Sequence, residues 1–246
     1  MKVALFVPCY VDQLYPQVGI ATYNLLKKFN LHVTFPENQT CCGQPMANAG
    51  CEHLAIPAYH NFINAFRGFD YVVAPSGSCV YHVRTHYDLL PQSEQVEYLR
   101  SNVFELTDFL VQILGVEGFK GSFPKRVGLH LSCHGQRGLR NAACSEITNI
   151  KGGNARKLLT SIRGLQLAEL DRDDECCGFG GTFCVTEEAV SSRMGIDRIT
   201  DHEKHGAEVL TGGDMSCLMH LEGLLKRRKS QVQVMHVAEI FDLAML

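Results

Sequence analysis

The sequence lacks tryptophan, low-complexity runs and any apolar stretch long enough to cross a bilayer. Its net charge is only −3 over 246 residues, so it lacks the strongly basic character that nucleic-acid binding requires. The apolar residues after Lys2 are too few for an export signal, and Asp12 stands where a small-residue cleavage site would be. We therefore expect a soluble, cytoplasmic protein with no nucleic-acid partner and no membrane span.

Cysteine pairs of the Cys-x-x-Cys type are also absent. No two cysteines are separated by two residues, the spacing that structural zinc sites and ferredoxin-type cluster loops use. The glycines of 178–181 follow a cysteine pair and do not directly follow a strand, so they do not indicate a dinucleotide-binding loop. A redox protein without a flavin or nicotinamide site would depend on partners to supply or accept electrons.

Cysteine is abundant, with eleven residues, and eight of them form a pattern that occurs twice. A Cys-Cys-Gly triplet lies between a cysteine far upstream and another far downstream in each half of the chain. The two sets are Cys9, Cys41, Cys42 and Cys79, and Cys133, Cys176, Cys177 and Cys217. A chain with 46% apolar residues can build an ordinary core and does not need disulfides as staples. The repeat therefore predicts a duplicated metal or redox site.

Strand-like and helix-like segments alternate in each half, and the cysteines follow the strands. Strands are expected over 3–8, 32–35, 71–74, 126–131, 165–170 and 207–211. Such alternation is typical of α/β folds, whose sites form at the carboxyl ends of parallel strands. We predict two pseudo-repeated domains, 1–118 and 119–246, joined through a glycine-rich linker over 115–125. Each would be a small parallel sheet flanked by helices, with a cluster site at the strand carboxyl ends.

Adjacent cysteines suit a multi-iron cluster better than a single zinc ion, because neighbouring side chains diverge and can bind different metal atoms. The glycine after each pair would let a backbone N–H approach a sulfur. A disulfide between Cys41 and Cys42 would leave Cys9 and Cys79 unexplained. We therefore interpret each set of four as the ligands of one iron–sulfur cluster. The three cysteines without a counterpart are expected to be ordinary buried residues: Cys51, Cys144 and Cys184.

Several motifs besides the cysteines are similar to one known family. They are the residues 35–37, 40–45, 75–79, 176–183 and 234–239. Together they resemble the cysteine-rich CCG domain family, which includes the catalytic subunit of heterodisulfide reductases and the iron–sulfur subunit of glycolate oxidase. Within it, the chain most resembles the lactate-utilisation protein A family, and the resemblance covers almost its whole length.

This resemblance implies an iron–sulfur subunit of an oxidoreductase system that oxidises L-lactate to pyruvate. It implies two [4Fe–4S] clusters, a partner with ferredoxin-type clusters, a third lactate-utilisation protein, and a small hydroxy acid as a candidate ligand. It assigns no catalytic residue, and the chain is not expected to be active alone. Two alternatives stay open: a heterodisulfide-reductase-like thiol–disulfide redox subunit, and a non-catalytic electron-transfer or scaffold protein.

The chain departs from the wider family at one position in each half. Where heterodisulfide reductases continue Cys-x-x-Cys, this sequence has His82 after Cys79 and His220 after Cys217. These histidines are candidates for cluster ligation or for hydrogen bonding to a ligand. Two other histidines, His130 and His134, flank Cys133 and are candidate hydrogen-bond donors, although His130 is equally consistent with a satisfied core residue. Candidate carboxylate clamps for a hydroxy acid are Lys2, Arg84, Arg137 and Arg140.

Overall fold

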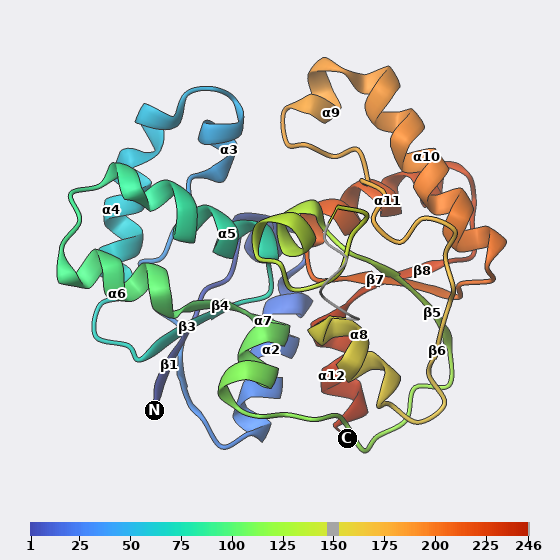
Figure 1. Ribbon diagram of the computed structural model, residues 1–246, viewed down its shortest axis with the longest axis horizontal. Helices are drawn as coiled ribbons and strands as arrows, with labels where there is room; N and C mark the ends of the chain where they lie inside the picture. The colour runs from blue at the N-terminus through green and yellow to red at the C-terminus, as the bar shows by residue number, and fades with distance from the viewer. Residues whose placement is uncertain (147–152, 246) are drawn as a thin grey trace.

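Two parallel four-stranded sheets organise the fold of the computed structural model, which describes residues 1–146 and 153–245 (Figure 1). The strands of the first sheet lie in the order β2-β1-β3-β4, and those of the second in the order β6-β5-β7-β8. They are β1 (Lys2–Leu5), β2 (His32–Thr34), β3 (Tyr71–Ala74), β4 (Val103–Glu105), β5 (Arg126–His130), β6 (Gln166–Leu167), β7 (Val209–Gly212) and β8 (Gln233–His236). The predicted α/β fold with two pseudo-repeated halves is thus confirmed.

The two sheets also share their registers. Val3 pairs with Tyr71 in the first sheet, and Val127 pairs with Val209 at the corresponding point of the second. In each half the chain first leaves the central strand on one side and then returns to pair on its other side. Open α/β sheets build their sites at this change of direction, outside the carboxyl ends of the strands. The strand expected over 165–170 is shorter than predicted, with two residues in β6.

Helices connect the strands and cover the sheets. In the first half they are α1 (Cys9–Leu14), α2 (Pro16–Lys28), α3 (Gln44–Asn48), η1 (Glu52–Ala55), α4 (Ile56–Ala65), α5 (Gly77–His86), η2 (Tyr87–Leu89), α6 (Glu94–Asn102), α7 (Leu106–Asp108) and η3 (Phe109–Ile113). In the second half they are η4 (His134–Gly138), α8 (Asn154–Thr160), α9 (Phe183–Thr186), α10 (Glu188–Lys204), α11 (Met215–Arg227) and α12 (Val237–Ala244). None of these described helices has both the length and the apolar character needed to cross a membrane.

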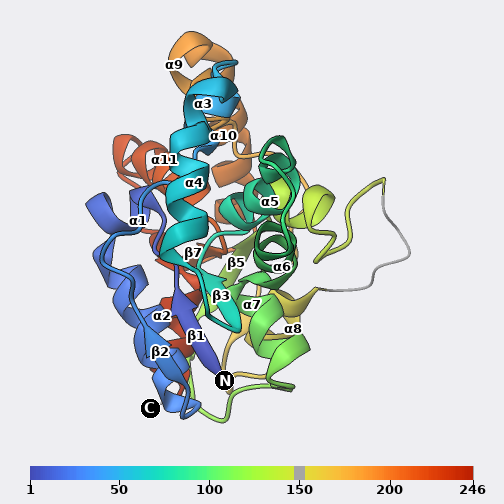
Figure 2. The same ribbon diagram turned by 90° about the vertical axis from the view of Figure 1, so that its left-hand side faces the viewer.

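Alternate residues of the central strands face two different cores, as the pleat requires. In β1, Ala4 and the following Phe6 face outward, where α4, α5 and α6 cover the sheet (Figure 2). Val3 and Leu5 face inward and join a second apolar cluster. The corresponding residues of β5, Val127 and Leu129, belong to that same inner cluster, so the two halves share one core.

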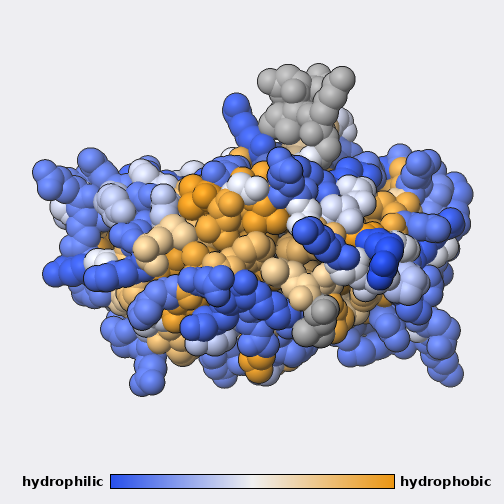
Figure 3. Space-filling view, turned by 90° about the horizontal axis from the view of Figure 1, so that it is seen from below, coloured by the Kyte–Doolittle hydropathy of each residue, from blue (hydrophilic) through white to orange (hydrophobic). Residues whose placement is uncertain are grey.

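Helices from both halves complete this shared core. α2 packs against α12, and Lys28 Nζ lies 2.7 Å from Asp242 Oδ1 across the contact. Phe119, in the predicted linker, is buried and stacks on Phe241 with ring centroids 4.8 Å apart. Seen from below, apolar residues gather along the middle of the surface, with polar residues around them (Figure 3). The domain boundary between residues 118 and 119 stays a prediction.

Candidate functional site

All eight repeated cysteines line one cavity of about 430 Å³ at the carboxyl ends of the strands. Residues of α3 and α9, which face each other at the top of Figure 1, also line it. The described cysteines are all free thiols, with no disulfide among them. The structure therefore brings both predicted sets of four together around a single space.

The first set forms a continuous chain of contacts. The thiols of Cys9 and Cys42 hydrogen-bond to Cys41, and Cys42 also contacts Cys79. Hydrogen bonds from Cys42 and Cys9 lower the pKa of Cys41 to about 3. The backbone N–H of Gly43 also donates to Cys41 Sγ, at 3.4 Å. The same hydrogen bonds raise the pKa of Cys9 and of Cys42. The group thus stabilises one thiolate, at Cys41, in the form that binds iron.

The second set repeats this arrangement. Hydrogen bonds from Cys133 and Cys177 lower the pKa of Cys176 to about 2, and Cys177 also contacts Cys217. The N–H of Gly178 donates to Cys176 Sγ at 3.4 Å, as Gly43 does in the first half. An additional N–H, from the residue after Gly178, donates to Cys177 Sγ at 3.4 Å.

The glycine of each Cys-Cys-Gly triplet is required by its backbone. Gly43 has φ +92° and Gly178 has φ +87°, a region that residues with a side chain rarely adopt. A Cβ at Gly43 would lie 2.5 Å from Tyr59 Cε1, and one at Gly178 would lie 2.6 Å from Ser191 O. Only glycine therefore lets the chain turn here and direct its N–H at the sulfur of the first cysteine of the triplet.

The last cysteine of each set lies in the first turn of a helix. Cys79 is the third residue of α5, and Cys217 is the third residue of α11. The partial positive charge at a helix N-terminus stabilises a thiolate or an anionic cluster. In both halves the last cysteine of the set therefore lies where a helix N-terminus favours an anionic cluster.

The residues that precede these two helices connect the halves. Asp214 Oδ1 accepts hydrogen bonds from Ser76 Oγ at 2.7 Å, Ser78 Oγ at 2.8 Å and Ser78 N at 3.0 Å. All three residues are buried and line the cavity. Ser76 and Asp214 also form an antiparallel bridge. No pattern in the sequence indicates this contact, which fixes the position of one cysteine set relative to the other.

The donor set fits an iron–sulfur cluster in each half. Four sulfurs converge in each half, and backbone N–H groups already point at some of them, as hydrogen bonding to cluster thiolates requires. Cys51, Cys144 and Cys184 are not among the described residues that line the cavity. Cys144 is buried, whereas Cys51 and Cys184 are half-buried.

Comparison with known proteins agrees with the repeat. The cysteine-rich CCG domain matches residues 3–84 and again 127–222. Lactate utilization protein A of Bacillus subtilis (strain 168) is 40% identical over 248 residues, which cover 98% of this chain and 99% of that protein. The chain belongs to the lactate utilization protein A family. Lactate utilization protein A 2 of Bacillus cereus (strain 03BB102) is 38% identical, over 98% of this chain and 97% of its own.

A solved structure supports the fold of this lactate utilization protein A family member. The crystal structure of a hypothetical protein from Helicobacter pylori superposes with a TM-score of 0.60 at 15% sequence identity. The match covers 99% of this chain and 49% of that chain. At this identity the likeness concerns the fold alone.

Most of the other predicted site residues of this family member are not among the described residues that line the cavity. His82 Nε2 lies 3.0 Å from Tyr59 Oη, and His220 Nε2 lies 3.4 Å from Ser191 O. Neither histidine is among the described cavity-lining residues, whereas His134 is. The four candidate carboxylate clamps are also outside that set: Lys2, Arg84, Arg137 and Arg140.

His130 differs from a satisfied core histidine. Its side chain is only 2% exposed, and neither ring nitrogen has a hydrogen-bond partner among the described residues. A ring nitrogen of His130 and the sulfurs of Cys177 and Cys217 all lie within 4.8 Å of one another. The sequence placed His130 beside Cys133; the fold places it beside two cysteines more than 40 residues away.

Proposed function

We propose that this chain is the iron–sulfur subunit of an oxidoreductase system that oxidises L-lactate to pyruvate. The first cluster would be held by Cys9, Cys41, Cys42 and Cys79, and the second by Cys133, Cys176, Cys177 and Cys217. The observation that carries the proposal is the convergence of both sets on one cavity, each with a lowered thiol pKa and a backbone N–H directed at sulfur. The name shared by the relatives, lactate utilization protein A, supports lactate as the substrate.

The stoichiometry of the reaction agrees with two matched sites. Conversion of L-lactate to pyruvate releases two electrons and two protons. When bound, two [4Fe–4S] clusters would supply two one-electron carriers. The chain's own cysteines would hold them on either side of the cavity, and the bridge between Ser76 and Asp214 would keep the two sets at a fixed separation. Among the cavity-lining side chains, Ser132, His134 and Asn48 offer hydrogen-bond donors to a small polar ligand.

Partner proteins belong to the same proposal. We expect a ferredoxin-type iron–sulfur protein to exchange electrons with this chain, and a third lactate-utilisation protein to complete the system. A reducing, cytoplasmic compartment would keep the eleven thiols available for iron. No residue of this chain is assigned a catalytic role, and turnover is expected only with the partners present.

Anaerobic reconstitution tests the cofactor. We expect a brown protein with about eight irons and about eight sulfides per chain. Cys41→Ser should lower the iron content by about half, whereas Cys51→Ser, outside both sets, should leave it unchanged. Stoichiometric zinc without inorganic sulfide would exclude the proposed cofactor.

Genetic complementation tests the reaction. A strain that lacks this gene and has no other lactate dehydrogenase should fail to grow on L-lactate but grow on glucose. Wild-type protein should restore growth, and Cys41→Ser with Cys176→Ser should not. Unchanged growth of the deletion strain on lactate would contradict the proposal.

Disulfide reduction by the purified protein would favour a thiol–disulfide subunit, and reversible cluster reduction without turnover with any partner would favour an electron-transfer role.

A further inference from the structure

The two halves differ at one buried position next to their cysteine sets. Phe6 and His130 are equivalent, because each lies three residues before the first cysteine of its set and ends the outward-facing row of its central strand. Phe6 is fully buried and meets Phe62 at 4.9 Å and Phe66 at 5.7 Å, in edge-to-face geometry. The first half is thus closed behind its cysteines by three aromatic rings.

The second half has polar side chains at the equivalent buried position. His130 is accompanied by Arg198 and His202, one turn apart on α10, and both are 0% exposed. Phe62 and Phe66 have the same spacing at the end of α4, where Phe66 is the residue that follows the helix. A Cβ at Gly128 of β5 would lie 2.1 Å from His202 Nδ1, so the His202 ring packs directly on the strand. The aromatic layer of one half is therefore replaced by a buried polar layer in the other.

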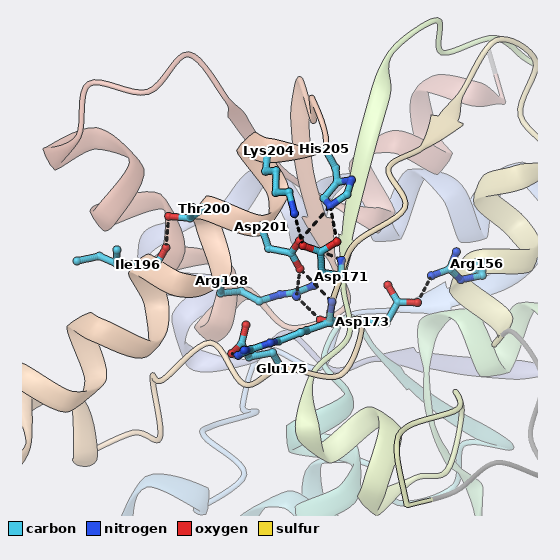
Figure 4. Close-up of polar contacts among 11 residues, drawn as sticks. Arg156, Asp171, Asp173, Glu175, Ile196, Arg198, Thr200, Asp201, Lys204 and His205 are labelled. Carbon is cyan, nitrogen blue, oxygen red and sulfur yellow. Dashed lines mark hydrogen bonds and ion pairs between the residues drawn. The ribbon is translucent and has the colours of Figure 1, made fainter.

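Arg198 is paired with a backbone carbonyl and a carboxylate rather than with a sulfur. Its Nη1 donates to the carbonyl of Arg172 and lies 3.3 Å from Asp201 Oδ2, so its charge is paired with a carboxylate (Figure 4), although its Nε and Nη2 have no partner among the described residues. Asp201 Oδ1 in turn accepts the N–H of Asp171 at 3.0 Å. Both ring nitrogens of His202 also lack a partner among the described residues, but of the two histidines it is His130 whose ring nitrogen lies within 4.8 Å of two cysteine sulfurs.

The chemistry of an imidazole fixes what His130 can do there. In any protonation state the ring carries at least one N–H, whereas a thiolate sulfur can only accept. A buried N–H without an acceptor is destabilising, and the cysteine sulfurs within 4.8 Å are the acceptors at hand. Hydrogen bonds to cluster sulfurs stabilise the additional negative charge of the reduced state and so raise the reduction potential.

We propose that, with a cluster bound, His130 donates a hydrogen bond to the sulfur of Cys177 or Cys217, and that the second cluster therefore has the higher reduction potential. The proposal rests on the proposed function, because it requires a cluster in each half. It also gives electron transfer within the chain a direction, because electrons would collect at the cluster of the second cysteine set. His130 is a positioning and tuning residue and not a ligand.

Potentiometric titration monitored by electron paramagnetic resonance tests the proposal on the anaerobically reconstituted full chain. Cys41→Ser with Cys42→Ser leaves the second site, and Cys176→Ser with Cys177→Ser leaves the first, so each signal can be assigned. In the intact chain, the assigned second site should have the higher potential. His130→Phe, which copies the first half, should lower its equilibrium constant for one-electron reduction at least tenfold, a shift of about 59 mV.

Two further variants separate hydrogen bonding from packing. His130→Gln keeps an N–H donor and should retain most of the potential of the wild-type second site. Phe6→Leu changes side-chain volume at the equivalent position and should leave the first potential unchanged. Equal potentials in the intact chain, or an unshifted second site in iron-replete His130→Phe, would overturn the inference. A chain without iron and sulfide would instead contradict the proposed function.

Discussion

Asp214 Oδ1 accepts a hydrogen bond from Ser76 Oγ at 2.7 Å, and these two residues occupy equivalent positions of the two halves. Each precedes the last cysteine of its set by three residues, at the start of α5 and α11. The repeated units therefore meet at their own corresponding points, as the subunits of a twofold dimer would. Because the pair is one serine and one aspartate, the contact is a strong hydrogen bond to a charged acceptor.

Removal of this carboxylate should weaken the contact between the halves. Asp214→Ala leaves the Ser76 hydroxyl, the Ser78 hydroxyl and the Ser78 N–H without their acceptor in a buried place. We expect the free energy of unfolding to fall by about 3 kcal/mol, measured by urea denaturation. Ser78→Ala is the control, since it removes one of these bonds and should cost about 1 kcal/mol. Equal stability of the wild type and Asp214→Ala would contradict this role.

The pH dependence of stability should report on Glu105. Burial, and then the nearby charge of Asp108, raise the pKa of this carboxyl to about 8. A group whose pKa is raised on folding stabilises the protein below its unfolded pKa of 4.5, and this contribution is lost as pH rises through 8. We therefore expect the free energy of unfolding to fall between pH 5 and pH 8, by on the order of 3 kcal/mol.

Glu105→Gln isolates this effect. Glutamine can still accept the N–H of Thr107, now at 2.8 Å from the carboxylate, but it cannot ionise. The variant should match the wild type near pH 5 and exceed its stability near pH 8, in urea denaturation at both values. The titration of cysteines cancels in this comparison, because both proteins contain them. A constant difference across the pH range would show that Glu105 does not titrate.

The triplet glycine should be irreplaceable in the second half. Gly178→Ala introduces a methyl group at φ +87° and 2.6 Å from Ser191 O, so both strain and overlap oppose folding. We expect a loss of about 3 kcal/mol and a lower iron content at the second site. Gly223→Ala is the matched control, because nothing lies within 4 Å of its Cβ and alanine favours helix α11. It should raise stability by up to about 1 kcal/mol.

Phe119 tests the shared core. Phe119→Ala should lower the free energy of unfolding by about 3 kcal/mol, since it removes a buried ring that stacks on Phe241. Because both halves contribute to this core, the near-UV and far-UV circular dichroism signals should change together in a single unfolding transition. Leu243→Ala, at a side chain that is 47% exposed, should have little effect. Two separate transitions in the variant would indicate that the halves unfold independently.

The repeat predicted the sheets and the two cysteine sets because duplication leaves a pattern along the chain. Contacts across the halves leave no such pattern. Asp214 follows two glycines and is typical of a loop residue, yet its partner is Ser76, which precedes α5 in the other half. The sequence does not indicate that Glu105 is buried, because its burial depends on how β4 packs. His130 was recognised as ambiguous, and only the fold shows which sulfurs lie beside it.

The division of each central strand between two cores limits where the copies can differ. Leu5 and Leu129 face the core that both halves build together, so a change there must suit two sheets at once. Phe6 and His130 face outward, where a single half decides what fits. The inward face of each central strand therefore joins the duplicated halves in one core. The outward face lets the polarity around each cysteine set differ between the halves.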